Sequence, residues 1–268
     1  MPDLAQTVIL FRGAGDVATG AALRLYGAGL RRLIFLEIPQ PMAVRRTVSF
    51  SEAVYEGRIT VEGVTALRAE TPADFASIWA RGAVPVLVDP AGRCVADIRP
   101  EVVVEATIAK TNIGVTRADA PLVIGVGPGF TAGEDVHRVV ETKRGFLMGR
   151  LLREGSAAPN TGRPGVVMGY DVERVLRAPC SGLFETSLDI GGAIRAGEAA
   201  GTVDGTPVLS QIDGIIRGLL RSGLRVAEGA KLGDVEPRNN VGFDKVSDKG
   251  MAVGGALLEA VLEHVLLG

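Results

Sequence analysis

The sequence predicts an α/β fold in which a doubly wound parallel sheet precedes a small β barrel-sandwich domain and a C-terminal helix. Before residue 165, helix-compatible segments alternate with short apolar runs typical of strands buried on both faces, at 8–11, 33–36, 84–88, 102–105 and 122–126. After residue 165, apolar pairs punctuated by glycine replace this alternation. We therefore predict a Rossmann-like nucleotide-binding domain over 1–165, a β sandwich over 166–243, and a segment over 244–268 whose helix packs back on the α/β domain.

Periodicity and N-terminal signals predict the helices. Apolar residues recur with the helical period over 17–26 and over 250–267. A further helix is predicted over 70–81, because Thr71 suits the N-cap position and Pro72 the first helical position.

An internal repeat organises the predicted β domain. The segments that begin at Ala178 and Ser210 align without a gap, at an offset of 32 residues (210 − 178). Four glycine pairs fall in register: Gly182/Gly214, Gly191/Gly223, Gly197/Gly229 and Gly201/Gly233. Glycine at fixed places in strand-like segments supplies bends and positive φ angles. The repeat predicts two intertwined halves of one small sandwich.

The composition argues against several classes of protein. A net charge of −2 and an isoelectric point near 5.8 give no basic field for nucleic acid. No run reaches 18 apolar residues, so no membrane span is expected, and residues 1–12 lack a basic region and a cleavage site, so no signal peptide is expected. Cys94 and Cys180 lie far apart in the sequence and in no CxxC motif. We therefore expect both to be reduced thiols and the protein to be cytoplasmic. These observations allow a homo-oligomer.

The first glycine loop has the pattern Gly13-x-Gly15-x-x-Ala18, after a buried strand and before a helix. Gly13 allows a sharp turn, and Gly15 lets the backbone approach a pyrophosphate at the helix N-terminus. Glu37, 22 residues after Gly15, is placed to accept hydrogen bonds from a ribose diol. The loop predicts a nucleotide site, with a purely structural turn as the alternative.

Three charged residues near this loop affect the prediction. Asp16 would repel phosphate unless its carboxylate caps the helix, and a cap would compete with the ligand for the same N–H groups. Arg45 and Arg46 follow the second strand and would grip phosphate bidentately, with a solvated surface pair as the alternative.

A second glycine loop follows the strand at 122–126 and is predicted to open another helix. Its anion-binding candidates are Gly127, Gly129, Thr131 and Gly133. His137, in the first turn of that helix, is a catalytic candidate, whereas His264 in the terminal helix is expected to be structural.

Lys110 and Asn112 directly follow another buried strand. Ligands of open α/β sheets gather beyond the carboxyl ends of strands, so Lys110 is a candidate phosphate partner or acid and Asn112 an orienting group. A plain connecting loop is the alternative. No HExxH, Walker A, GxSxG or cysteine–histidine metal pattern occurs, so no metal site is predicted and enzyme activity stays open.

The chain resembles the YqeB-like family, which is described as an accessory protein of selenium-dependent molybdenum hydroxylases. The resemblance runs in order over nearly the whole chain, through GAGDVATG, EIPQPMAVRRTVSF, GVGPGFTAGEDVHRVVET, REGSAAPNTG and VSDKGMAVGGALLEA. It implies a role in molybdenum hydroxylase maturation, a hydroxylase apoenzyme as partner, and ligand roles for the loop glycines and for Arg45 and Arg46.

The repeat is separately similar to biotinyl/lipoyl-like sandwich domains. Those domains carry their group on a lysine in the hairpin between the halves. No lysine occurs from Gly197 to Ala230, so no biotin or lipoate is expected.

Three functions follow from these observations. The first is a maturation protein that binds a nucleotide or molybdopterin dinucleotide while the cofactor is handled or inserted. The second is an NAD(P)-dependent oxidoreductase, and the third is a non-catalytic docking module. The need for selenium stays open.

Overall fold

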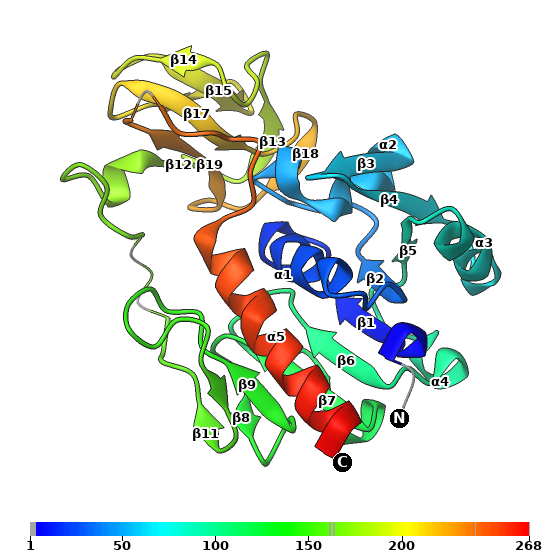
Figure 1. Cartoon of the computed structure of the whole chain (residues 1–268). Coiled ribbons are helices and arrows are strands. Elements are labelled where there is room, and N and C mark those ends of the chain that lie inside the picture. Colours follow the sequence, from blue (N-terminus) through cyan, green and yellow to red (C-terminus); the bar gives the residue numbers. More distant parts are fainter. Residues whose placement is uncertain (1–3, 161, 163, 239, 268) are drawn as a thin grey trace. The chain divides into compact units, whose positions relative to one another are not determined.

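The computed structural model describes residues 4–160, 162, 164–238 and 240–267 (Figure 1). Unit 1 comprises Met1–Pro41, Val48–Asn160 and Val246–Gly268, and unit 2 comprises Met42–Thr47 and Thr161–Lys245. The short segment Met42–Thr47 therefore belongs with the later β domain, although it lies inside the predicted α/β domain.

Unit 1 is built on a nine-stranded mixed sheet of order β10-β9-β7-β6-β1-β2-β5-β4-β3. Pairing is parallel from β9 to β4 and antiparallel at the two edges, with β10 and β3. Its strands are β1 (Ile9–Arg12), β2 (Leu33–Glu37), β3 (Arg58–Val61), β4 (Val64–Ala69), β5 (Val84–Val88), β6 (Val102–Glu105), β7 (Leu122–Val126), β9 (Arg138–Val140) and β10 (Leu151–Leu152). A separate small pair joins β8 (Thr131–Ala132) and β11 (Gly155–Ser156).

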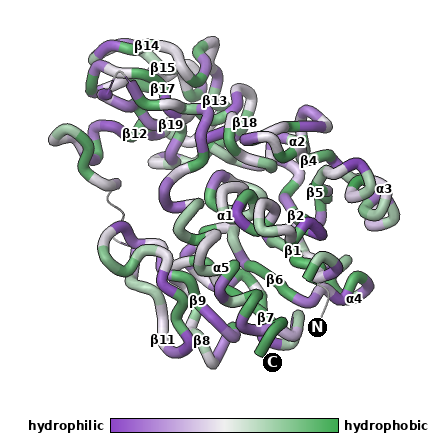
Figure 2. Tube along the Cα trace, viewed as in Figure 1, coloured by the Kyte–Doolittle hydropathy of each residue, from purple (hydrophilic) through white to green (hydrophobic). Residues whose placement is uncertain are grey.

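Helices cover both faces of this sheet. They are α1 (Asp16–Gly27), α2 (Ala53–Glu56), α3 (Phe75–Ala80), α4 (Val95–Ile98) and α5 (Asp248–Leu267), with 3₁₀ turns at Leu4–Gln6, Phe50–Glu52, Pro72–Asp74 and Arg117–Asp119. The 3₁₀ turn Arg46–Val48 spans the boundary of the two units in the sequence, and the turn Val172–Arg174 belongs to unit 2. Ile9 and Phe11 pack in one core with α1, α2 and α5, and Leu10 packs in the other with α3. Figure 2 shows the hydrophobic colour running through β1, β6 and β7. Strands buried on both faces explain the all-apolar runs of the sequence.

The strand order changes direction at β1. The chain continues from β1 to β2 on one side, and later enters β6 on the other side. The carboxyl ends of β2, β1 and β6 therefore lie together, at the kind of crevice where open α/β sheets bind ligands.

Helix α5 lies along α1 in Figure 1, and glycines allow the close approach. A Cβ on Gly20 would lie 2.9 Å from the Cα of Gly250, and one on Gly254 would lie 2.9 Å from the Cα of Ala21. Among the described residues, α5 alone is long and apolar enough to cross a membrane. Its buried residues Val253, Leu257 and Val261 belong to the core with α1, so packing explains its apolar character.

Unit 2 contains two four-stranded antiparallel sheets, β12-β19-β17-β14 and β16-β15-β13-β18. The strands are β12 (Val175–Arg177), β13 (Gly182–Glu185), β14 (Ala193–Ile194), β15 (Ala199–Val203), β16 (Thr206–Leu209), β17 (Gly214–Leu219), β18 (Leu224–Val226) and β19 (Lys231–Glu236). The repeat offset relates β12–β15 to β16–β19 in order, and each sheet takes strands from both sets. The two halves are intertwined, as the repeat predicts.

The helix predicted after the second glycine loop is wrong. That segment forms β8, a turn and β9. The Asp135 carboxylate accepts the Thr131 N–H at 2.9 Å, and the Gly133 N–H bonds to the carbonyl of Val136 at 2.9 Å. These bonds close the turn, and the β-branched Val139 and Val140 then pair as a strand.

Candidate phosphate site at the carboxyl edge of unit 1

Gly13 makes the sharp turn at the end of β1. Its φ is +93°, and a Cβ there would lie 3.0 Å from the main chain of Thr107. Its N–H bonds to the carbonyl of Leu36 at 2.8 Å. Only glycine suits this position, both for its backbone conformation and for its contact with the segment after β6.

Gly15 leaves the N-terminus of α1 open. It is the N-cap residue, with φ −69° and ψ −178°, and no side chain caps the helix. A Cβ at Gly15 would meet nothing within 4 Å. Because the first-turn N–H groups have no acceptor within the helix, they present partial positive charge to this space.

Glu37 stabilises the loop itself. Its Oε2 accepts the Ala14 N–H and its Oε1 accepts the Ile38 N–H, both at 2.9 Å. Burial is the largest influence on its pKa and raises it, with a smaller contribution from the Glu105 carboxylate, while the two hydrogen bonds oppose the shift. Each oxygen keeps a second lone pair, so a role toward a ribose diol is still compatible with this geometry.

The N-terminus of α5 meets the same edge. A Cβ on Gly250 would lie 3.4 Å from the Asp16 carbonyl, so the first turns of α5 and α1 are adjacent. The Ser247 side chain accepts the Gly250 N–H at 3.1 Å and begins α5. Sequence reasoning treated α5 as a packing helix only, although the Ser247-Asp248-Lys249-Gly250 start carried an N-cap signal.

Lys249 is the functional candidate that sequence reasoning missed. Burial lowers its pKa, and Arg144 lowers it further, whereas the carboxylates of Asp16, Asp248 and Glu141 oppose the shift. Among the described residues, no hydrogen-bond or ion-pair partner of its ammonium is found. A partly buried lysine beside two helix N-termini is suited to hold an anion.

This arrangement also explains Asp16. Its side chain makes no capping hydrogen bond, so it leaves the N–H groups of α1 available. Its carboxylate instead acts on Lys249. The Arg144 guanidinium pairs with Asp248 through both terminal nitrogens, one of them at 2.8 Å. The Arg144–Asp248 pair therefore leaves Lys249 without an ion-pair partner among the described residues.

The second glycine loop packs against neighbouring segments. A Cβ on Gly127 would lie 2.8 Å from the Thr142 hydroxyl, and one on Gly129 would lie 2.7 Å from the Thr111 nitrogen. The Thr131 hydroxyl bonds to that of Ser156 at 3.0 Å, and the Gly133 carbonyl accepts from Arg117 at 2.9 Å. These contacts are a structural explanation for the glycines of this loop. No helix N-terminus follows the loop.

Lys110 and Asn112 lie in the connection after β6. The Asn112 side chain accepts the N–H groups of Gly114 and Val115 and donates to the Val115 carbonyl, each at 2.9 Å, so it holds its own loop. Lys110 is exposed and has a φ of +67°. A Cβ on Gly129 would lie 2.8 Å from the carbonyl carbon of Lys110, so the main chain of Lys110 lies at the carboxyl edge.

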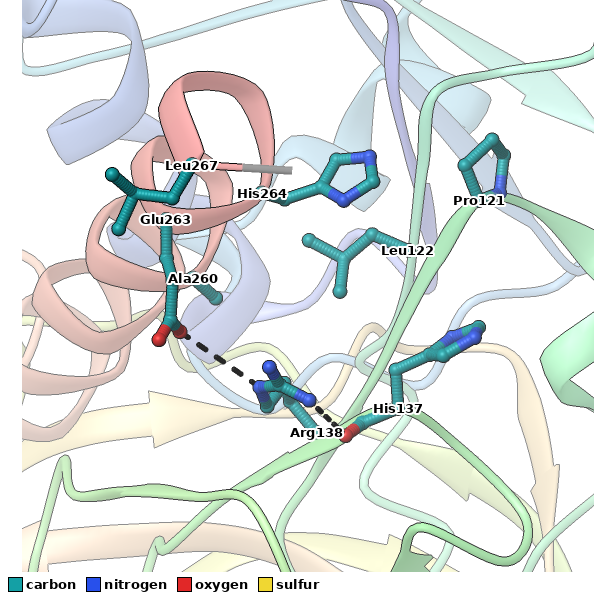
Figure 3. A pocket seen from close by; sticks show the side chains of 8 residues that line it. All are labelled: Pro121, Leu122, His137, Arg138, Ala260, Glu263, His264 and Leu267. Atoms are coloured by element: carbon teal, nitrogen blue, oxygen red, sulfur yellow. Dashed lines mark hydrogen bonds and ion pairs between the residues drawn. The ribbon is translucent and has the colours of Figure 1, made fainter.

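His137 lies at the opposite edge of the sheet. It precedes β9 at the amino ends of the parallel strands, and its Nδ1 accepts the Val123 N–H at 3.0 Å. With His264 on α5 and Arg138 on β9, it lines a pocket of about 260 Å³ (Figure 3). The His264 Nε2 lies 2.7 Å from the Glu101 carboxylate. The structure thus places His137 at the edge opposite Gly13 and Gly15, the first glycine loop.

The environment of His137 predicts a pH dependence of stability. Burial lowers its pKa from 6.5, and Arg117, Arg138 and His264 add to this shift. Because the unfolded histidine then binds its proton first, this stabilisation is present above pH 6.5 and declines as pH falls toward the lower folded pKa. We expect His137→Asn, which keeps an acceptor for Val123, to flatten the dependence of unfolding free energy on pH.

Chemical denaturation between pH 5 and 7.5 measures this effect. His137→Phe, which removes the acceptor, should be less stable than the wild type at every pH. Coincident pH profiles for the wild type and His137→Asn would contradict the assignment.

Arg45 and Arg46 belong to unit 2. The Arg45 guanidinium donates to the carbonyls of Phe243 and Lys245, at 3.3 and 2.9 Å. Arg46 donates to the Leu219 carbonyl at 2.7 Å and to Asp189 at 2.8 Å. Both arginines thus hold the segment Met42–Thr47 within unit 2.

Comparisons with known proteins support the family resemblance. No protein-family model matches the chain. The chain is 44% identical over 257 residues to "Uncharacterized protein YqeB" of Escherichia coli (strain K12), which supports a YqeB-like family. The match covers 95% of this chain and 47% of that protein, so the chain spans about half the length of this relative. In the residues that the structure describes, no group of three or more metal-ligating side chains occurs.

Two of the solved structures that match are distant in sequence. A succinylglutamate desuccinylase/aspartoacylase from Rhodobacter sphaeroides is 19% identical, with a TM-score of 0.27 and coverage of 87% of this chain and 86% of that one. An aspartoacylase family protein from Mesorhizobium loti is 11% identical, with a TM-score of 0.28 and coverage of 86% and 85%.

Proposed function

We propose that unit 1 is a Rossmann-like domain that binds a nucleotide or dinucleotide cofactor through its phosphates. The observation that carries this proposal is the open N-terminus of α1 at Gly15, next to the partly buried Lys249. The strand order places this N-terminus at the change of direction between β1 and β6. Backbone N–H groups would hold the phosphate, and Lys249 would supply a compensating charge near Asp16.

We propose further that this binding serves molybdenum hydroxylase maturation. The support is the sequence resemblance, together with the similarity to YqeB over most of the chain. Molybdopterin dinucleotide carries a pyrophosphate, so it suits the same cradle as other dinucleotides. The partner would be the hydroxylase apoenzyme, in the cytoplasm. The proposal needs no reaction at the site.

NAD(P)-dependent oxidoreduction is a second candidate. Glu37 favours it, because its carboxylate lies at the end of β2 and its Oε2 accepts the Ala14 N–H of the glycine loop. The proposals differ in ligand, so one experiment distinguishes them.

A thermal-shift screen tests the proposed function. The full chain is compared alone and with NAD, NADP, ATP, CTP and molybdopterin dinucleotide. A ligand present at 100 times its Kd should stabilise the fold by about 2.7 kcal/mol. A shift with molybdopterin dinucleotide supports the first proposal, and a shift confined to NAD or NADP supports the second. If every compound leaves the melting temperature unchanged at millimolar concentration, both proposals fail.

Lys249→Met should weaken the binding of the phosphate ligand by about 10- to 100-fold. The substitution removes a charge-assisted hydrogen bond to phosphate, worth about 1.5–3 kcal/mol, while keeping a side chain of similar length. The measurement is a calorimetric titration of the ligand found in the screen.

Lys110→Met is the matched comparison, because it removes an exposed lysine of the same edge. It should change affinity only slightly. An equal loss in the two variants, or no loss in Lys249→Met, would contradict the role of Lys249.

A further inference from the structure

A second pocket of unit 1 lies away from α1 and α5. It has a volume of about 800 Å³ and is lined mainly by small residues, among them Ala91, Gly92, Val95, Ala96, Ala118 and Ala120. A volume of this size is in the range of small-molecule sites. Val95 and Ala120 belong to the core that faces α3, on the side of the sheet opposite α1.

The fold leaves this space because one layer is thin here. Helix α4 has only four residues, Val95–Ile98. The connection from β6 to β7 contains one 3₁₀ turn, Arg117–Asp119, where a doubly wound sheet usually has a crossover helix. Short side chains on both segments leave the volume unfilled.

Arg12 is the charged group in the depth of this pocket. It ends β1, and its side chain is only 11% exposed. Its Nε lies 3.3 Å from Oε2 of Glu105, which is 1% exposed and directly opposite on β6. Within the described residues, the terminal guanidinium nitrogens have no protein acceptor. They are therefore available to an acceptor that enters the pocket.

The other charged groups that line the pocket are Arg99 and Asp119, one of each sign. Arg99 lines it after α4 and is exposed. The carboxylate of Asp119 is already engaged, because it accepts the N–H and hydroxyl of Thr116 in a capping box. Glu105 and Asp119 balance Arg12 and Arg99 in charge, so the attraction for an anion rests on the terminal nitrogens of Arg12.

We propose that this pocket binds a small organic anion, with its carboxylate, sulfonate or phosphate group on Arg12 and its apolar body against the alanines. Arginine holds such groups in a bidentate geometry, and small aliphatic walls favour a compact apolar body. This site is independent of the proposed phosphate site, because the Arg12 side chain lies on the face of the sheet opposite α1.

Fluorescent probes test the proposal. The full chain is titrated with 8-anilinonaphthalene-1-sulfonate, an aromatic sulfonate, and with N-phenyl-1-naphthylamine, its uncharged analogue. Ala96→Trp and Ala118→Trp place a large side chain at exposed positions of the wall and should abolish binding of the sulfonate. Ala76→Trp, at an exposed position of α3 outside the pocket, is the matched control and should leave binding unchanged.

The charge is tested with Arg12→Met/Glu105→Gln, which removes both members of the buried pair and leaves no unpaired carboxylate. This variant should lower the affinity for the sulfonate by about 10-fold or more and leave the affinity for the uncharged probe nearly unchanged. Gly15→Val should change neither probe, which separates this site from the phosphate site.

Two results would overturn the proposal. Sulfonate binding that survives both alanine-to-tryptophan changes would place the probe elsewhere. An equal loss of affinity for the two probes in Arg12→Met/Glu105→Gln would mean that Arg12 does not bind the anionic group.

Discussion

Gly15→Val is expected to weaken binding of the phosphate ligand by at least about 100-fold while the protein stays folded. The backbone of Gly15 lies in the β region, with a φ of −69° that any residue can adopt. A Cβ at this position meets nothing within 4 Å. The branched side chain would therefore start in open space, and we expect it to block the approach to the α1 N–H groups. Loss of a hydrogen-bonded anion site of this kind costs about 3 kcal/mol, which corresponds to about 100-fold in affinity.

Gly13 is a poorer probe of the same loop. Its φ of +93° and its contact with the Thr107 main chain mean that any side chain strains the turn. Loss of binding in a Gly13 variant would therefore report misfolding as readily as a blocked site. Gly15 separates the two effects, since its replacement leaves the turn intact.

Gly27→Val is the matched control for this prediction. Gly27 ends the same helix, is exposed, and also has open space at its Cβ position. Both variants should fold, with small losses of stability. Ligand titration by calorimetry should show wild-type affinity for Gly27→Val only. If Gly15→Val binds as tightly as the wild type, the N-terminus of α1 is not the cradle.

The sequence predicts the sheet of unit 1 well, because strands buried on both faces leave continuous apolar runs. All five predicted runs coincide with β1, β2, β5, β6 and β7 to within one residue. The strands β3, β4, β8, β9, β10 and β11 were not predicted, since they are short or partly exposed and carry a weaker pattern. Glycines in register likewise predicted the interleaved strands of unit 2.

The candidate site was harder to predict. Gly13 and Gly15 form a local motif, so the sequence alone identifies them. Lys249 reaches the site only because α5, more than 200 positions later in the chain, packs along α1 at Gly20 and Gly250. The helix wrongly predicted after the second loop has a local cause rather than a long-range one. Gly133 and Asp135 formed local turn bonds that a helix pattern could not reveal.

Gly254→Ala is expected to lower the stability of unit 1 by about 2 kcal/mol or more. Gly254 is buried where α5 crosses α1, and an added Cβ would lie 2.8 Å from the Arg24 side chain and 2.9 Å from the Cα of Ala21. The Arg24 side chain can move, but the main chain of α1 moves only if the helices separate. Overpacking of this kind typically costs about 1–3 kcal/mol.

Gly255→Ala provides a control with the opposite sign. Gly255 is the next residue of α5, is exposed, and has open space at its Cβ position. Alanine should raise stability there by about 0.5–1 kcal/mol, because it is the better helix former. The two variants have the same composition, so a difference between them reports the helix crossing rather than helix propensity.

Trp79, the one tryptophan of the chain, makes the measurement specific to unit 1. It lies in α3, and its indole N–H bonds to the Leu33 carbonyl at 3.0 Å, so its fluorescence reports unfolding of the sheet. Urea denaturation followed at Trp79 should show a lower midpoint for Gly254→Ala and a higher one for Gly255→Ala. Equal midpoints for the two variants would mean that α5 does not pack on α1. The placement of Lys249 beside α1 would then fail with it, because the same crossing brings the two helix N-termini together.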